Sequence, residues 1–262
     1  MTDISLLAAA DSPHVNALHP SPNIEPRQAG YRPDMLLLHY TGMHSCEKAI
    51  DWLARPESKV SCHYVVAEDG TITQMVAESM RAWHAGQSIW SGTTDINSCS
   101  IGIEIHNPGH AQGYPDFPDA QMDAVTRLSA DIVTRNRISK SRVLAHSDVA
   151  PQRKIDPGEK FNWHRLAQAG VGRWIAPQPI EATQWSLGSG SRSEKVADAQ
   201  HLLRSYGYGI DVTGTLDAPT VFVLRAFQLH WRPDLVDSQL DRSTLETLSR
   251  LVQAEQDEIA VA

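Results

Sequence analysis

The sequence predicts an α+β protein, in which a mixed β-sheet flanked by helices is followed by a small all-α domain of three helices. Short apolar or alternating runs, typical of strands, are interleaved with helical periodicity between residues 35 and 176. Beyond a stretch rich in proline, glycine and serine, apolar residues recur only at helical spacing. We therefore expect an extended arm over 1–34, a larger domain over 35–176, a linker over 177–191 and a helical domain over 192–262.

The first half of the larger domain combines strands with one short helix. Residues 11–34 hold several prolines and little periodicity, as expected of an extended arm. Residues 35–39 are a continuous apolar run ending in histidine, which is typical of a strand buried on both faces. Residues 49–53 carry a short amphipathic helix that a following proline ends. Residues 63–67 and 71–76 flank an Asp-Gly turn, which predicts a β-hairpin.

The second half adds two strands and two helices. Residues 100–106 alternate strictly, with three isoleucines on one face and a glycine, Glu104 and a histidine on the other. Residues 119–136 show helical spacing, and their first residue, an aspartate, is the expected N-cap. A short strand over 143–146 and a helix near 163–169 complete the domain.

Beyond the linker the pattern is purely helical. One helix spans apolar positions from Val196 to Tyr206 and is closed by a glycine. Two more open with similar phrases, Leu-Asp-Ala-Pro-Thr-Val and Leu-Asp-Arg-Ser-Thr-Leu, in which Asp217 and Asp241 can cap the first turn. This internal similarity, together with the first helix, predicts a compact three-helix bundle.

Composition excludes several classes of protein. The 262 residues are 41% hydrophobic and carry a net charge of −8, so the chain can bury a core and lacks the basic balance of a nucleic-acid-binding protein. No stretch approaches the roughly 18 apolar residues of a membrane span. The first residues lack a basic region, a long apolar run and a cysteine for a lipid anchor, so we expect a cytoplasmic protein, with a periplasmic or envelope location as the alternative. No pattern predicts an oligomeric state.

Twelve histidines and only three cysteines make histidine the first candidate for chemistry. His39 closes the first predicted strand, His146 closes the last one, and Asp156 follows in a turn before Pro-Gly. Two neutral imidazoles and one carboxylate are a known ligand set for catalytic Zn²⁺, which leaves a position for a water of pKa about 7. Glu104 is then the candidate general base, and Lys154 the candidate group to stabilise an oxyanion.

Five ordered motifs between about residues 34 and 176 carry a family resemblance. They are His39-Tyr-Thr, Ser61-Cys-His63-Tyr-Val-Val, Arg81-Ala-Trp-His84-Ala-Gly-Gln-Ser, Ser100-Ile-Gly-Ile-Glu104 and His146-Ser-Asp-Val-Ala-Pro-Gln-Arg-Lys154-Ile-Asp156-Pro-Gly. In this order they resemble the motifs of the zinc-dependent N-acetylmuramoyl-L-alanine amidases, a family that includes anhydro-muropeptide amidases and peptidoglycan recognition proteins. Gln152 is the visible departure, where the family has glycine, and it touches no expected ligand.

The resemblance implies the same roles as the residue types do. It implies one zinc ion per chain, held by His39, His146 and Asp156, with Glu104 as the catalytic glutamate and Lys154 as the transition-state lysine. His63 and His84 also match motif positions, so it implies that they line the substrate groove, with structural hydrogen bonding as the alternative. Arg81 is the expected partner of a substrate carboxylate. The remaining histidines, His230 among them, are expected at the surface or in helix packing.

The helical domain carries a second, shorter resemblance. Its phrases Ala199-Gln-His-Leu-Leu203, Gly207-Tyr-Gly and Leu224-Arg-Ala-Phe-Gln228 are similar to the three-helix peptidoglycan-binding module fused to wall hydrolases. The resemblance covers residues 192–253. A bundle that only mediates oligomerisation is the alternative.

Together these features predict hydrolysis of the amide between N-acetylmuramic acid, or its 1,6-anhydro form, and L-alanine in peptidoglycan or muropeptides. Such an activity serves cell-wall degradation or recycling. Three alternatives stay open: a non-catalytic peptidoglycan receptor of the same fold, an amidase using Cys46, Cys62 or Cys99 as nucleophile, and a non-haem iron site. The pairing of Glu104 with Lys154 suits hydrolysis better than iron chemistry. The sequence does not separate polymeric from soluble anhydro-muropeptide substrates.

Overall fold

The computed structural model describes residues 7–181 and 185–261, and the chain divides into two compact units. The first unit consists of Met1–Gly86, Asp95–His146 and Lys160–Arg173, and the second of Gln87–Thr94, Ser147–Glu159 and Trp174–Ala262. Residues 1–6 of the predicted arm and 182–184 of the predicted linker lie outside the described residues. The domain boundaries drawn from the sequence stay a prediction.

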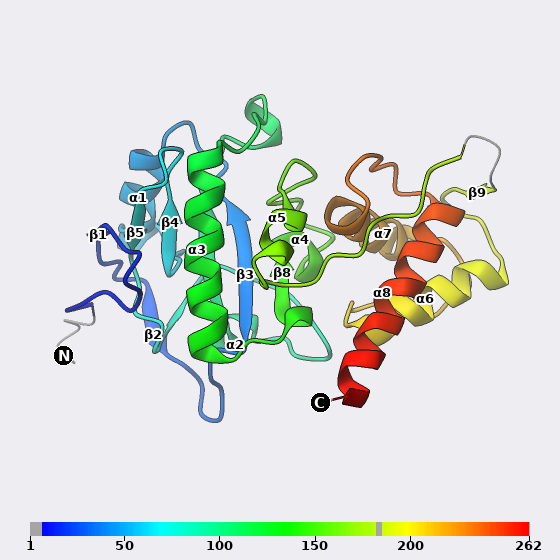
Figure 1. The fold of residues 1–262 in the computed structure, drawn as a ribbon, viewed down its shortest axis with the longest axis horizontal. Helices are drawn as coiled ribbons and strands as arrows, with labels where there is room; N and C mark the ends of the chain where they lie inside the picture. The colour runs from blue at the N-terminus through cyan, green and yellow to red at the C-terminus, as the bar shows by residue number, and fades with distance from the viewer. Residues whose placement is uncertain (1–6, 182–184, 262) are drawn as a thin grey trace. The chain divides into compact units, whose positions relative to one another are not determined.

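A six-stranded mixed sheet forms the centre of the first unit (Figure 1). Its strands, in spatial order, are β1 (Ala17–Leu18), β5 (Ile72–Gln74), β4 (Tyr64–Val66), β7 (Ser100–Ile105), β3 (Met35–Tyr40) and β8 (Val143–Ala145). All neighbours pair in parallel except β4 and β5, which form the predicted hairpin. The first four residues of β3 are completely buried, which explains their unbroken apolar run.

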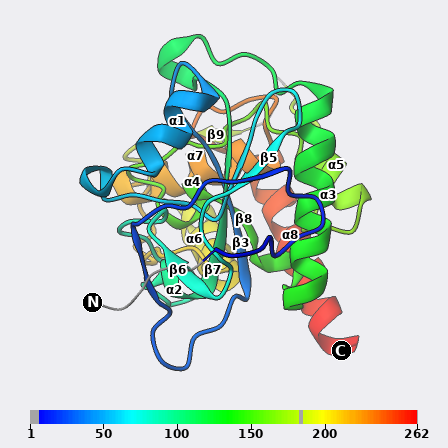
Figure 2. The same cartoon turned by 90° about the vertical axis from the view of Figure 1, so that its left-hand side faces the viewer.

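The long helix α3 (Asp119–Asn136) runs alongside the strands and packs on β3 and β4 (Figures 1 and 2). Its buried side chains include Met122, Val125, Leu128 and Ile132, which recur at helical spacing. The other helices between residues 35 and 176 are α1 (Cys46–Leu53), α2 (Ile96–Cys99), α4 (His146–Val149) and α5 (Trp163–Gln168), with single 3₁₀ turns at Pro56–Ser58, His110–Gln112 and Lys140–Arg142. The predicted α+β class is confirmed.

Several predicted element boundaries are wrong by a few residues. The strand β3, for example, ends at Tyr40 and not at His39. The strand β8 ends at Ala145, and His146 is the first residue of α4 instead of the last residue of the strand. Asp119 does not cap α3, because the N-cap position is Pro118 and no side chain caps the helix there. The Asp119 carboxylate lies 2.7 Å from a guanidinium nitrogen of Arg165 instead.

Part of the predicted arm forms strands that the sequence did not indicate. β1 pairs in parallel with β5, and β2 (Ile24–Pro26) pairs antiparallel with β6 (Met80–Ala82) in a separate two-stranded sheet. These strands have two or three residues each, too few to show a period of their own. The arm therefore contributes to the first unit through short edge pairings.

The second unit contains the three predicted helices, which are α6 (Glu194–Tyr206), α7 (Ala218–Trp231) and α8 (Arg242–Val261). Both predicted caps are present, because Asp217 accepts from the Thr220 N–H at 3.1 Å and Asp241 from the Thr244 N–H at 2.7 Å. A short antiparallel ribbon joins β9 (Ser186–Leu187) to β10 (Leu240–Asp241).

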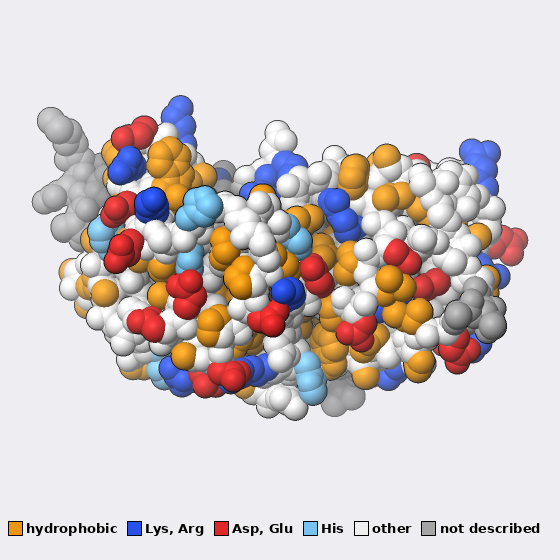
Figure 3. Space-filling view, turned by 90° about the horizontal axis from the view of Figure 1, so that it is seen from above, with side chains coloured by type: hydrophobic (Ala, Val, Ile, Leu, Met, Phe, Trp, Pro, Cys, Tyr) orange, Lys and Arg blue, Asp and Glu red, His pale blue; other side chains and the backbone are white. Residues whose placement is uncertain are grey.

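The distribution of charged side chains on the surface agrees with the acidic net charge of the sequence. Acidic and basic side chains are interspersed over the face drawn in Figure 3, which shows no continuous basic area. Within the described residues, no helix has both the length and the apolar character needed to cross a membrane.

Candidate metal centre

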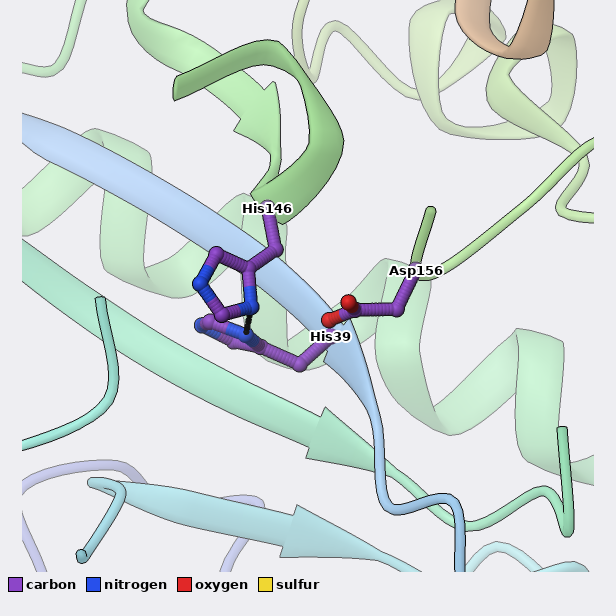
Figure 4. Close-up of side chains that lie close together, drawn as sticks. All are labelled: His39, His146 and Asp156. Atoms are coloured by element: carbon purple, nitrogen blue, oxygen red, sulfur yellow. Dashed lines mark hydrogen bonds between the residues drawn. The ribbon is translucent and has the colours of Figure 1, made fainter. Parts of the chain in front are cut away.

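Three buried side chains that could hold a metal ion meet beside the ends of β3 and β8. His39 lies near the end of β3, His146 directly follows β8, and Asp156 lies in the loop after α4. Their ligand atoms all lie within 4.8 Å of one another, and Figure 4 shows the three side chains converging. The structure thus brings together the three residues that the sequence predicted as ligands.

A chain of hydrogen bonds sets the protonation of His39. The Ser100 hydroxyl donates to the Ile96 carbonyl at 2.6 Å, so its oxygen accepts from Nε2 of His84 at 3.3 Å. Nδ1 of His84 therefore carries no proton and accepts from Nε2 of His39 at 3.0 Å. With its proton on Nε2, His39 turns the Nδ1 lone pair toward the centre.

His146 is oriented in the same way by a backbone group. Its Nε2 lies 3.1 Å from the Ala85 carbonyl oxygen, which can only accept, so the proton of His146 is also on Nε2. The two Nδ1 atoms face each other at 2.8 Å, the contact drawn as a dashed line in Figure 4. Two nitrogen lone pairs at this distance repel each other, and the Asp156 carboxylate lies beside them. A bound cation would remove this repulsion. The residues therefore fit a divalent metal ion.

Glu104 is related to this cluster by strand register, and Lys154 is close to one of its members in the sequence. β3 and β7 pair in parallel with His39 opposite Glu104, so both side chains project from the same face of the sheet. Glu104 is half-buried. Lys154, also half-buried, lies two residues before Asp156, and its backbone N–H donates to the Ala150 carbonyl at 3.0 Å. Their catalytic roles stay predictions.

The two other motif histidines are held in structural hydrogen bonds. His63 is completely buried, accepts from the Gly102 N–H through Nδ1 at 3.0 Å and donates to the Met80 carbonyl through Nε2 at 3.1 Å. Burial and the nearby Arg27 guanidinium lower the pKa of His63 to about 3, so its ring is neutral. His84 is buried as well and orients His39. These contacts favour the structural alternative that the sequence left open.

Arg81 is occupied by protein carboxylates. Its guanidinium lies 2.7 Å from Glu25 of β2 and 3.0 Å from Asp95, the N-cap of α2. Sequence motifs alone could not reveal these partners, because both lie outside the motif and one belongs to the arm. The two ion pairs favour a structural role for Arg81 over a contact with substrate.

The cysteines are in the wrong protonation state for a nucleophile. Burial raises the pKa of Cys46 and Cys99 to about 11, and it raises the pKa of the completely buried Cys62 well above its usual value. A nucleophilic cysteine requires a thiolate and therefore a lowered pKa. These environments argue against the cysteine amidase.

Gly102 leaves the room that His84 needs, a role that the sequence did not reveal. A Cβ at this position would lie 2.6 Å from Nδ1 of His84. We therefore expect Gly102→Ala to displace the ring, lower the free energy of unfolding by about 1–3 kcal/mol and weaken metal binding about 10-fold. Denaturant unfolding and metal titration measure both. Gly188→Ala is the control, because its added Cβ meets nothing within 4 Å. Metal affinity equal to that of the control would contradict the role given to His84.

Comparison with known proteins now identifies the family. The family described as N-acetylmuramoyl-L-alanine amidase matches residues 29–159, which is half of the chain. The chain belongs to this amidase family. The predicted helical domain of this amidase also has a match, because the family described as putative peptidoglycan binding domain matches residues 192–248.

Individual amidases resemble the chain over most of its length. The N-acetylmuramoyl-L-alanine amidase AmiD of Escherichia coli is 36% identical over 233 residues, which are 83% of this chain and 82% of AmiD. A structure of AmiD with anhydro-N-acetylmuramic acid-L-Ala-D-γ-Glu-L-Lys has a TM-score of 0.73 at 34% identity, covering 87% of this chain and 91% of AmiD. AmpDh3 of Pseudomonas aeruginosa, solved with an anhydromuramic pentapeptide, has a TM-score of 0.69 at 28% identity, covering 95% of this chain and 97% of AmpDh3.

Proposed function

We propose that this amidase uses one Zn²⁺ to hydrolyse the amide between N-acetylmuramic acid, or its 1,6-anhydro form, and L-alanine. The observation that carries the proposal is the cluster of His39, His146 and Asp156, in which both imidazoles turn an unprotonated Nδ1 toward the carboxylate. The relatives support the substrate class, because AmiD and AmpDh3 were both solved with anhydro-muropeptides bound.

Different residues of the chain would bind the metal, transfer the proton and stabilise the oxyanion during hydrolysis. His39, His146 and Asp156 would hold the metal, which when bound polarises a carbonyl and lowers the pKa of water. Glu104, on the same sheet face as His39, takes a proton from the attacking water and returns it to the departing amine of L-alanine. Lys154 carries an ammonium that would donate a hydrogen bond to the oxyanion as it forms.

The receptor alternative is disfavoured by the same residues. A receptor requires only a groove, whereas this chain keeps three potential ligands, a carboxylate beside them and a lysine in the adjacent loop. The relatives at this level of similarity are named as amidases. We also propose that the helical domain binds peptidoglycan, on the strength of its family match.

The test is to identify the products of the reaction. The purified zinc-loaded chain is incubated with anhydro-N-acetylmuramyl tripeptide, and mass spectrometry should find free peptide beginning with L-alanine together with the anhydro-sugar. A chelator should abolish the release, added Zn²⁺ should restore it, and a thiol alkylator should leave it unchanged. A parallel incubation with intact sacculi separates polymer from soluble fragments as substrate. Cleavage at another bond, or activity that survives complete metal removal, would refute the proposal.

A further inference from the structure

A fully buried polar cluster in the second unit takes no part in the chemistry above. The side chain of Asp148 is completely buried, and it accepts a hydrogen bond from the Tyr208 hydroxyl through Oδ1 at 2.6 Å. Its other oxygen, Oδ2, lies 2.7 Å from Nδ1 of the buried His230. A buried carboxylate is costly unless its oxygens are bonded, so the three side chains depend on one another.

Asp148 lies in the short helix α4, which leads directly into the loop that carries Lys154 and Asp156. Its neighbour Ser147 donates its backbone N–H to the carbonyl of Asp156 at 3.0 Å, which closes the loop on itself. The Lys154 N–H donates to the Ala150 carbonyl, also at 3.0 Å, and fixes the turn before the aspartate. Asp148 is therefore next in sequence to the residue that bonds the backbone of Asp156.

Tyr208 and His230 come from the helical part of the same unit. Tyr208 follows α6 and His230 lies in the last turn of α7. A third contact comes from α7, where the Arg225 guanidinium donates to the Pro151 carbonyl of the loop at 3.1 Å. The loop is thus bonded to the helical elements at two of its residues.

We propose that Tyr208 and His230 are positioning residues for the segment of residues 147–159, which contains most of α4 and the loop after it, so that the helical domain supports metal binding besides binding the cell wall. The inference rests on the proposed function, because it needs Asp156 as a ligand. A ligand holds its geometry only when its supporting contacts are fixed, and here the support is the bonded Asp148 carboxylate. The two donors are separated from the loop by about 60 and 80 residues of sequence.

The first test removes one hydroxyl from the full-length chain. Tyr208→Phe deletes the bond to Asp148 but keeps the ring, which packs edge-on against Trp90. Tyr64→Phe is the matched control, because the Tyr64 hydroxyl donates to another buried carboxylate, Glu78, at 2.7 Å. Zn²⁺ affinity is measured by competition with a chromophoric chelator, and stability by denaturant unfolding.

We expect Tyr208→Phe to raise the Kd for Zn²⁺ about 10-fold, within the range of outer contacts of metal sites. Backbone amides of residues 150–156 should also exchange with deuterium faster. The control should lose similar stability and keep its Zn²⁺ affinity. Equal Zn²⁺ affinities in the two variants would overturn the inference.

The second test asks whether an N–H donor at position 230 suffices. His230→Leu removes the donor, whereas His230→Asn places an amide N–H near the original Nδ1. Leucine should weaken Zn²⁺ binding and asparagine should restore most of it, whereas equal losses would contradict positioning. Failure of the proposed function is recognised separately, because Asp156→Ala would then leave Zn²⁺ affinity unchanged. If Asp156→Ala weakens Zn²⁺ binding and Tyr208→Phe has no effect on it, only the present inference fails.

Discussion

Replacing Glu104 with glutamine is expected to lower kcat for muropeptide hydrolysis about 1,000-fold, the middle of the range for general acid–base catalysis. Glutamine keeps the shape of the half-buried side chain but neither accepts the proton of the attacking water nor returns it to the amine. Because Glu104 is opposite His39 on the neighbouring strand and is not one of the clustered ligands, the variant should keep its zinc. Single-turnover kinetics and zinc content measured on one preparation check both expectations.

Glu57→Gln serves as the control, because this glutamate is exposed in the turn after α1. It should match the unmodified chain in kcat, zinc content and melting temperature. Substantial turnover by Glu104→Gln would remove Glu104 from the role of base. Loss of zinc from that variant would instead indicate that Glu104 supports the metal directly.

The sequence predicted strands correctly where the pattern of apolar residues matches the pattern of buried side chains. The apolar run before His39 predicts a doubly buried strand, and the structure confirms β3 with its first four residues inaccessible. The strict alternation before Glu104 likewise predicts β7. The pairing of these two strands could not be predicted. The alternation of apolar residues indicates on which face of the sheet a side chain lies, but it does not indicate which strand is the neighbour. The register that sets Glu104 beside His39 required the fold.

The hydrogen bonds that orient the metal cluster could not be predicted from the sequence, for a related reason. The protonation of His39 depends on His84, Ser100 and the Ile96 carbonyl, three groups that meet only in the folded chain. A glycine at position 102, between two isoleucines of the strand, was the available signal, since such a glycine marks close approach by another group. Here that group is the His84 ring.

The wrong boundaries and the undetected contacts also have physical causes. Asp119 was expected to cap α3, but it pairs with Arg165, a residue 46 positions away. His230 was expected at the surface or in helix packing, because its partner Asp148 lies 82 residues earlier in the chain and no local pattern indicates it. Local patterns predict caps and periods, whereas ion pairs between distant segments depend on tertiary structure.

Replacing Asp156 with alanine is expected to weaken Zn²⁺ binding at least about 100-fold, because even outer contacts of metal sites contribute 10- to 100-fold. The change removes the only carboxylate of the cluster and leaves two imidazoles, whose unprotonated Nδ1 atoms lie 2.8 Å apart. Without the metal, turnover should fall below detection. Competition with a chelator measures the affinity, and product release from anhydro-muropeptide measures the activity.

Asp51→Ala is the control for this loss, since that aspartate is exposed on α1. It should bind Zn²⁺ with unchanged affinity, and a variant of Asp156 that did the same would exclude Asp156 as a ligand. The contrast with Glu104→Gln then separates two kinds of failure. A lost ligand removes metal and turnover together, so excess Zn²⁺ should recover part of the activity of Asp156→Ala. A lost base leaves the metal in place, so no concentration of Zn²⁺ should restore Glu104→Gln.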